Sequence, residues 1–149
     1  MSSPSIDVQA RIENTPEAVM GYIANVRNRP LYLPSLKSVA DIKETPGGAG
    51  TTWKWTWVSL GMSFEGIGRC LNYEPGRLYS FKTEGGIEST WTYKTEPEGD
   101  GQATKLTIHV DYAVPERARP ILPSDKIGDA MKKTEADQVI QNLKTILDR

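Results

Sequence analysis

The chain has 149 residues, of which 18 are basic and 19 acidic, giving a formal net charge of −1. This length fits one domain, residues 1–149, and allows roughly 70% of the unfolded chain's surface to be buried. The balanced charge argues against a protein that binds nucleic acid or an anionic membrane, and a single cysteine excludes an internal disulfide.

The first ten residues, MSSPSIDVQA, contain neither a basic start nor an apolar stretch, which predicts the absence of a signal peptide. No run in the chain approaches the roughly 18 apolar residues of a membrane helix. The lone cysteine fits a reducing compartment. We therefore expect a cytoplasmic protein with no integral membrane segment.

The N-terminal quarter predicts one strand and two short helices. Residues 5–12 alternate apolar and polar side chains, which is typical of a half-buried strand. Thr15 is a suitable N-cap for a following helix, with Pro16 at the first helical position. Prolines on both sides of Tyr32 restrict the next helical segment to a short one.

The remainder predicts a sheet followed by a long helix. Segments with a period of two, separated by glycine and proline turns, predict about six consecutive strands after residue 36. Strands linked in this way form an antiparallel sheet, and residues 125–148 form a helix whose apolar side must pack on it. The expected class is α+β: about six to seven strands wrapped around a long C-terminal helix, with two short helices after the first strand.

This order resembles the helix-grip fold of the START/SRPBCC superfamily, in particular its polyketide cyclase/dehydrase and lipid-transport group. Four stretches carry the resemblance: IENTPEAVMGYIANVRNRPLYLPSL, GGAGTTW, LNYEPGRLYSF and NLKTILD. Asn25 stands where the group usually has an acidic residue, and Tyr32 where it usually has a tryptophan. The resemblance implies a curved sheet gripping the long helix, with a cavity between them. It does not choose among carriers, cyclases and other proteins.

Three of the four tryptophans, Trp53, Trp55 and Trp57, occupy alternate positions of one expected strand. If the more apolar set of each strand faces inward, the tryptophans lie on the concave face and the charged set lies outside. An outward-facing dimer patch is the alternative. The other residues that we predict to line a cavity are Tyr32, Met62, Phe64, Tyr79, Phe81, Trp91, Tyr93, Ile108, Val110 and Tyr112.

Two glycines favour a cavity over a filled core. Gly66 and Gly68 take inward positions on the strand after the tryptophans, and a glycine supplies no side chain to fill the space. On the same strand, Ile67 and Leu71 are apolar residues at outward positions, which suggests a β-bulge.

The expected C-terminal helix has no continuous apolar stripe. Six residues of its second half share one face: Ala136, Val139, Ile140, Leu143, Ile146 and Leu147. In its first half, Ile127 and Met131, which we also predict to line the cavity, lie on roughly the opposite side. Either the helix breaks near Gly128 or Thr134, or its first half covers a wet cavity mouth with the lysine pair 132–133 at the entrance. A third interpretation is a solvated helix end.

No catalytic constellation is evident. His109, the one histidine, falls on an outward position, away from any pocket in which a general base would act. Cys70 is inward but has no histidine to activate it, so a buried structural role is favoured. We predict no catalytic residue, no metal site and no cofactor.

The leading hypothesis is a protein that binds or transports an apolar or amphipathic small molecule, such as a lipid, a quinone or a polyketide-like aromatic. The site would lie between the sheet and the C-terminal helix. One alternative is a polyketide cyclase, aromatase or dehydratase acting on a similar ligand, for which tyrosines and the lysine pair 132–133 are the available inward groups. Another is a protein-interaction module. We expect no nucleic-acid partner, and a monomer or weak homodimer.

Overall fold

Seven strands form one antiparallel sheet with the order β1-β7-β6-β5-β4-β3-β2. The computed structural model describes residues 5–59, 61–113 and 125–149, and for residue 59 and residues 125–134 it describes the backbone alone. The strands are β1 (Ser5–Ile12), β2 (Leu36–Lys43), β3 (Thr52–Ser59), β4 (Met62–Glu74), β5 (Leu78–Gly85), β6 (Ser89–Glu98) and β7 (Ala103–Tyr112). Helix α1 (Pro16–Ala24), the 3₁₀ turn η1 (Val26–Asn28) and helix α2 (Arg29–Tyr32) follow β1, and α3 (Asp125–Leu147) follows β7.

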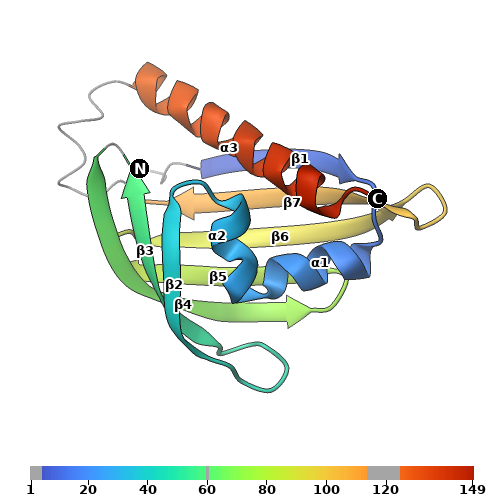
Figure 1. The fold of residues 1–149 in the computed structure, drawn as a ribbon, viewed down its shortest axis with the longest axis horizontal. Coiled ribbons are helices and arrows are strands. Elements are labelled where there is room, and N and C mark those ends of the chain that lie inside the picture. Colours follow the sequence, from blue (N-terminus) through green and yellow to red (C-terminus); the bar gives the residue numbers. More distant parts are fainter. Residues whose placement is uncertain (1–4, 60, 114–124) are drawn as a thin grey trace.

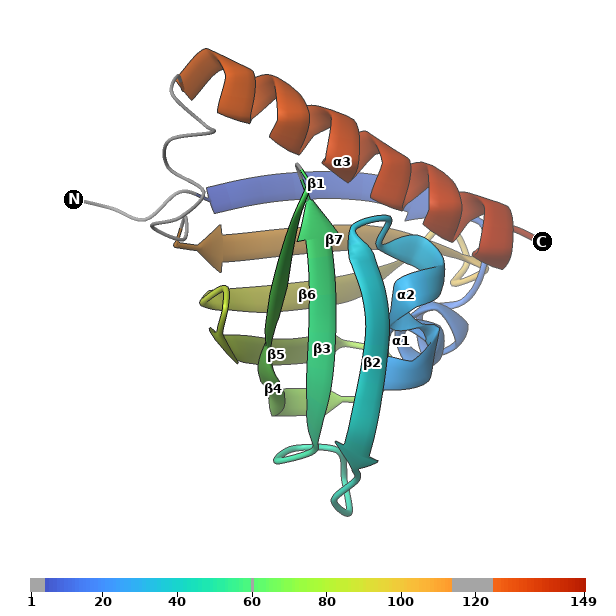
Figure 2. The same ribbon diagram turned by 60° about the vertical axis from the view of Figure 1, so that its left-hand side comes forward.

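All three α-helices lie on the same side of a strongly curved sheet (Figure 1). The curvature turns β2 and β3 steeply across the direction of β6 and β7, and α3 runs along β1 (Figure 2). Helix α2 packs beside α3, and α1 packs on β5, β6 and β7. This arrangement confirms the predicted α+β helix-grip architecture. Among the described residues, no helix is long and apolar enough to cross a membrane.

Helix α1 begins as its sequence predicts. The Thr15 hydroxyl accepts a hydrogen bond from the Ala18 amide (3.3 Å), and Pro16 occupies the first helical position. This cap satisfies one of the amides that a helix start leaves without an intrahelical partner. The apolar face of α1, with Val19 and Ile23 fully buried, then packs on the sheet.

Helix α3 is continuous from Asp125 to Leu147, which rules out the alternative of a break near Gly128 or Thr134. In its second half the buried residues are Val139, Leu143 and Leu147, which are spaced four residues apart and so share one face. Ile146 lies at the margin of this line and is 40% exposed, which corrects its predicted place on the buried face. The side chains of Ile127, Met131 and the lysine pair 132–133 lie outside the described residues.

The end of α3 is tied to the corner between β1 and α1. The Asn14 side chain donates to the Leu147 carbonyl (2.9 Å), which would otherwise lack a partner at the helix end. The Glu13 amide donates to the Asp148 carboxylate (2.8 Å), and the Arg149 amide donates to the Glu13 carbonyl (3.0 Å). These bonds hold the second half of α3 beside the sheet.

The alternation of inward and outward residues follows the prediction. Trp53 and Trp55 are 2% and 5% exposed, so the tryptophan row faces the helices and does not form an outer patch. Trp57, at the end of the row, is half-buried. Ile67 and Leu71 are exposed, and the register of β4 against β5 shifts at Leu71, as expected for a bulge.

Candidate functional site

The inward glycines of β4 do not leave an empty space, contrary to the prediction. Gly66 pairs with Trp55 across the ladder, and Gly68 pairs with Trp53. A Cβ atom at Gly66 would lie 2.0 Å from the backbone carbonyl oxygen of Glu84 and 2.5 Å from Cζ2 of Trp55, and one at Gly68 would lie 2.3 Å from Cε2 of Trp53. The indoles therefore lie over the glycine backbone, and glycine is needed because the rings, and at Gly66 also a neighbouring carbonyl, occupy the space of a side chain.

The missing side chain at Gly68 allows Trp53 to reach across β4. Its ring meets that of Phe81 on β5 edge-on, with 5.4 Å between centroids. Phe81 in turn stacks on Trp91 of β6 at 5.6 Å, directly opposite it in the ladder. An aromatic surface thus extends without interruption over β3, β5 and β6.

Arg29, the first residue of α2, lies on this aromatic surface and is 1% exposed. Its guanidinium carbon lies 4.3 Å from the ring centroid of Phe81, 4.9 Å from that of Trp53 and 5.2 Å from that of Tyr79. These distances are those of cation–π contacts, which become stronger where water is excluded. One Arg29 nitrogen, Nη2, also donates to the Tyr79 hydroxyl (2.8 Å) and to the Ile23 carbonyl (3.3 Å).

The other guanidinium nitrogens, Nε and Nη1, have no hydrogen-bond partner among the described residues. A guanidinium carries five N–H bonds, so three of them lack an acceptor. The hydroxyls of Tyr32 and Tyr93 and the indole nitrogen Nε1 of Trp55 are likewise buried without a partner. Buried polar atoms in proteins are nearly always hydrogen-bonded. These unpaired atoms therefore indicate that the inner face of the sheet lacks hydrogen-bond partners, which a bound molecule could supply.

The electrostatics keep Arg29 charged and keep Tyr79 and Tyr93 protonated. Burial alone lowers the pKa of Arg29, but interaction with the hydroxyls of Tyr32, Tyr79 and Tyr93 outweighs it, and the pKa lies above the ordinary value. Burial raises the pKa of Tyr79 and raises that of Tyr93 well above its ordinary value, with Arg29 opposing both changes. Neither tyrosine is suited to act as a base near neutral pH.

The structure places most of the predicted lining residues on this inner face. Buried in the core are Tyr32, Trp53, Trp55, Phe64, Tyr79, Phe81, Tyr93, Ile108 and Val110, and partly buried against it are Trp57, Met62, Trp91 and Tyr112. Ile127 and Met131 belong to α3, and their side chains lie outside the described residues. Whether any of these residues contacts a ligand stays a prediction.

Sequence reasoning missed Arg29, which is the main polar group of the inner face. The expectation that tyrosines and the lysine pair 132–133 are the available inward groups was incomplete for this reason. A signal was present in the spacing: Val26, Arg29 and Tyr32 follow one another at intervals of three, and all three are buried. In a 3₁₀ turn, residues three apart lie on the same side.

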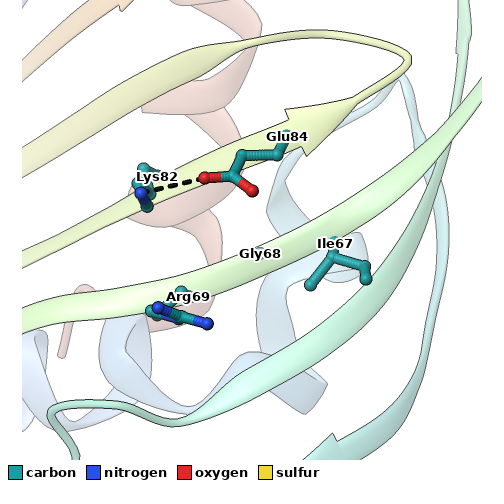
Figure 3. Close-up of a pocket in the computed structure, with 5 residues that line it drawn as sticks. All are labelled: Ile67, Gly68, Arg69, Lys82 and Glu84. Atoms are coloured by element: carbon teal, nitrogen blue, oxygen red, sulfur yellow. Dashed lines mark ion pairs between the residues drawn. The ribbon is translucent and has the colours of Figure 1, made fainter.

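Other candidate groups lie away from this face or are inert. A small pocket on the outer side of the sheet, between β4 and β5, is lined by Ile67, Gly68, Arg69, Lys82 and Glu84 (Figure 3). Its Lys82 and Glu84 side chains already form an ion pair (2.9 Å). His109 is outward, as predicted. The Cys70 thiol is buried, and burial raises its pKa, so it is a poor nucleophile.

A family model described as polyketide cyclase / dehydrase and lipid transport matches residues 3–148. The chain belongs to this family. The match spans nearly every residue, from before β1 to the end of α3, and it confirms the resemblance stated from the sequence. A search of curated proteins found no match to this chain by sequence.

Solved structures share the START/SRPBCC-type fold of this family member. Protein TTHA0849 of Thermus thermophilus is 18% identical, with a TM-score of 0.76 and coverage of 95% of each chain. The Zhui aromatase/cyclase of Streptomyces sp. R1128 is 12% identical, with a TM-score of 0.73 and coverage of 95% of this chain and 92% of the other. A START superfamily protein of Mycobacterium smegmatis is 12% identical, with a TM-score of 0.71 and coverage of 95% and 98%. At these identities the likeness concerns the fold.

Proposed function

We propose that this protein binds an apolar or amphipathic small molecule between the sheet and α3, and that it carries the molecule without transforming it. The observation behind the proposal is the aromatic inner face with its five buried, unpaired polar atoms on Arg29, Tyr32, Trp55 and Tyr93. Small-molecule sites typically combine apolar walls with a few polar groups that orient the ligand. A lipid, a quinone or a polyketide-like aromatic would suit such a surface.

The aromatic content supplies the affinity in this proposal. Covering apolar surface contributes roughly 25 cal/mol per Å² before the cost of ordering the ligand. Aromatic residues take up most of the centre of the inner face, from Trp53 on β3 to Tyr93 on β6. We propose that the lining consists of the thirteen predicted sheet and α2 residues described above, with Ile127 and Met131 contributed by α3.

The carrier role is favoured over a cyclase, aromatase or dehydratase by the kinds of groups on the inner face. Acid–base catalysis needs a group that exchanges protons near the working pH. Among the described buried groups around Arg29, Tyr79, Tyr93 and Cys70 all have raised pKa values. These groups can orient a ligand by hydrogen bonds but are poorly suited to move its protons.

The wider setting of the proposal follows from the sequence. We infer a single domain, residues 1–149, located in the cytoplasm as a monomer or weak homodimer. Its partner is a hydrophobic small molecule, and nucleic acid plays no part, since 18 basic and 19 acidic residues leave no positive excess. We propose no metal or other cofactor for it.

The test is native mass spectrometry of protein purified without detergent, followed by denaturing extraction of bound molecules. One apolar molecule per chain is the expected result. Trp91→Ala, at a half-buried position stacked on Phe81 and Tyr93, should reduce the bound fraction. Ile67→Ala, on the exposed outer face, is the control and should retain the ligand. An empty protein whose tryptophan emission is unmoved by lipids and aromatic compounds would show that the inner face is filled core.

A further inference from the structure

We propose that the ligand carries a carboxylate group, and that Arg29 binds this group inside the core with the hydroxyls of Tyr32 and Tyr93 as neighbouring donors. The inference rests on the proposed function, because it names the polar end of the molecule that the aromatic face would hold. It identifies the ligand class as an amphipathic monoanion, such as a fatty acid or an aromatic acid.

The first step is the missing counter-charge. Arg29 is 1% exposed, and its side chain forms neither an ion pair nor a hydrogen bond with any described carboxylate. An isolated buried charge is costly, and buried charges in proteins are ordinarily paired. The aromatic rings offset part of this cost but accept no hydrogen bond in the plane of the guanidinium. A negatively charged ligand group would supply the counter-charge that the described residues do not.

The second step is that the cation is already held in place. Its Nη2 nitrogen is fixed by the Tyr79 hydroxyl and the Ile23 carbonyl, while Nε and Nη1 have no partner among the side chains that the structure describes. A donor held in one geometry before binding loses little entropy when the anion arrives. Hydrogen bonds between a charged donor and a charged acceptor are also about twice as strong as neutral ones.

The third step concerns the tyrosines. The hydroxyls of Tyr32 and Tyr93 are both buried and lie close to each other, since an interaction with Tyr32 contributes to the raised pKa of Tyr93, and both interact electrostatically with the guanidinium. Burial raises the pKa of Tyr93 well above its ordinary value, so its phenol keeps its proton and can donate to an anion. Together with Nε and Nη1, these hydroxyls offer donors and no negative charge.

The fourth step selects a single negative charge. Arg29 is the only buried charged side chain among the residues whose burial is described, so the site has one unit of positive charge. A carboxylate balances it, whereas a doubly charged phosphate would bring a second uncompensated charge into an apolar core. The apolar remainder of the ligand can lie on the rings around Arg29, which leaves the acid group as the only part that needs donors.

The experiment compares three ten-carbon probes on the unmodified protein: decanoate, 1-decanol and decyltrimethylammonium. They share a chain and differ in the charge of the head group. Isothermal titration calorimetry below the micelle concentrations measures each affinity. We expect decanoate to bind at least about tenfold more tightly than decanol, the lower end of what a charged hydrogen bond contributes, with the ammonium weakest.

Variants then assign the preference to Arg29. Arg29→Met removes the charge and keeps an apolar side chain of similar length, a change that often leaves a core as stable or more so. It should abolish the preference for decanoate while decanol binding stays within about threefold. Tyr93→Phe, which removes one hydroxyl, should reduce the preference in part. Arg69→Met, an exposed arginine on the outer face of β4, is the matched control and should preserve it.

The outcomes separate the two proposals. Equal affinity of the unmodified protein for decanoate and decanol, or a preference that survives Arg29→Met, overturns the carboxylate site and leaves a carrier of neutral molecules. In that case Arg29 is a structural cation held by its aromatic neighbours. If none of the three probes binds and no apolar molecule co-purifies, the proposed function itself fails, and the carboxylate site fails with it.

Discussion

Replacing Gly68 by alanine tests the packing of the tryptophan row directly. The new Cβ would lie 2.3 Å from Cε2 of Trp53, whereas carbon atoms pack at about 3.5–4.0 Å. The indole must therefore retreat by more than about 1 Å, and overpacking of this kind costs about 1–3 kcal/mol. Gly68 does not have a positive φ, so alanine regains about 0.5–1 kcal/mol of the entropy that glycine loses on folding.

We expect a net loss of about 1–2 kcal/mol, or roughly 2–8 °C in Tm for a chain of this size. Urea unfolding followed by circular dichroism and by tryptophan emission measures it. Gly21→Ala is the control, because its Cβ has nothing within 4 Å and it lies on the exposed side of α1, where alanine should stabilise by about 1 kcal/mol. If Gly68→Ala were as stable as Gly21→Ala, the indole of Trp53 would not occupy the space over β4. The empty space that the sequence predicted beside Gly68 would then be present after all.

Two further predictions concern the outer face and the long helix. A hydrogen bond with Asp7 (2.5 Å) is the largest cause of a raised pKa of His109, with Asp111 adding to it. Because the folded pKa lies above the unfolded value of about 6.5, the pairing stabilises fully below that pH and is lost as the pH rises through the folded pKa. The stability lost on His109→Gln, measured in urea, should therefore be larger at about pH 5.5 than at about pH 8.5; equal losses would refute the pairing. Leu143→Ala on α3, at a fully buried position, should cost about 2–5 kcal/mol, whereas Ile146→Ala should cost under about 1 kcal/mol; similar losses would mean that the helix is rotated.

The fold could be predicted because its signals are local and repeated. In β3 a charged residue, Lys54, stands between Trp53 and Trp55, and this alternation places the indoles on one side of the strand and the lysine on the other. Thr15 and Pro16 likewise define the start of α1 through their own chemistry. Where a single residue lies at the edge of a buried stripe, as Ile146 does, the pattern is too coarse, because burial there depends on the exact line of contact between α3 and its neighbours.

The candidate site could not be predicted to the same extent, because the burial of its main polar group, Arg29, depends on tertiary packing. Arg27 and Arg29 stand two residues apart, and the sequence distinguishes them only by the three-residue spacing of Arg29 from Val26 and Tyr32. Arg27 is exposed and paired with Glu44 (2.6 Å), whereas Arg29 is fully enclosed. The difference arises from the short 3₁₀ turn between α1 and α2, which directs every third residue toward the sheet. A buried arginine without a carboxylate is also rare enough that sequence patterns favour an exposed one.

The tryptophan row and the buried arginine are parts of one arrangement. Trp53 reaches Phe81 because Gly68 has no side chain, and the two rings together form much of the surface on which the Arg29 guanidinium lies. A residue larger than glycine on β4 would separate the rings and remove part of the cation–π stabilisation that makes an unpaired cation tolerable in the core. The Trp53 indole therefore does more than fill volume: it stabilises a positive charge whose remaining N–H bonds have no acceptor among the described residues and can bind an anion. On this reasoning, the glycine in the sheet controls the affinity for a charged ligand without touching it.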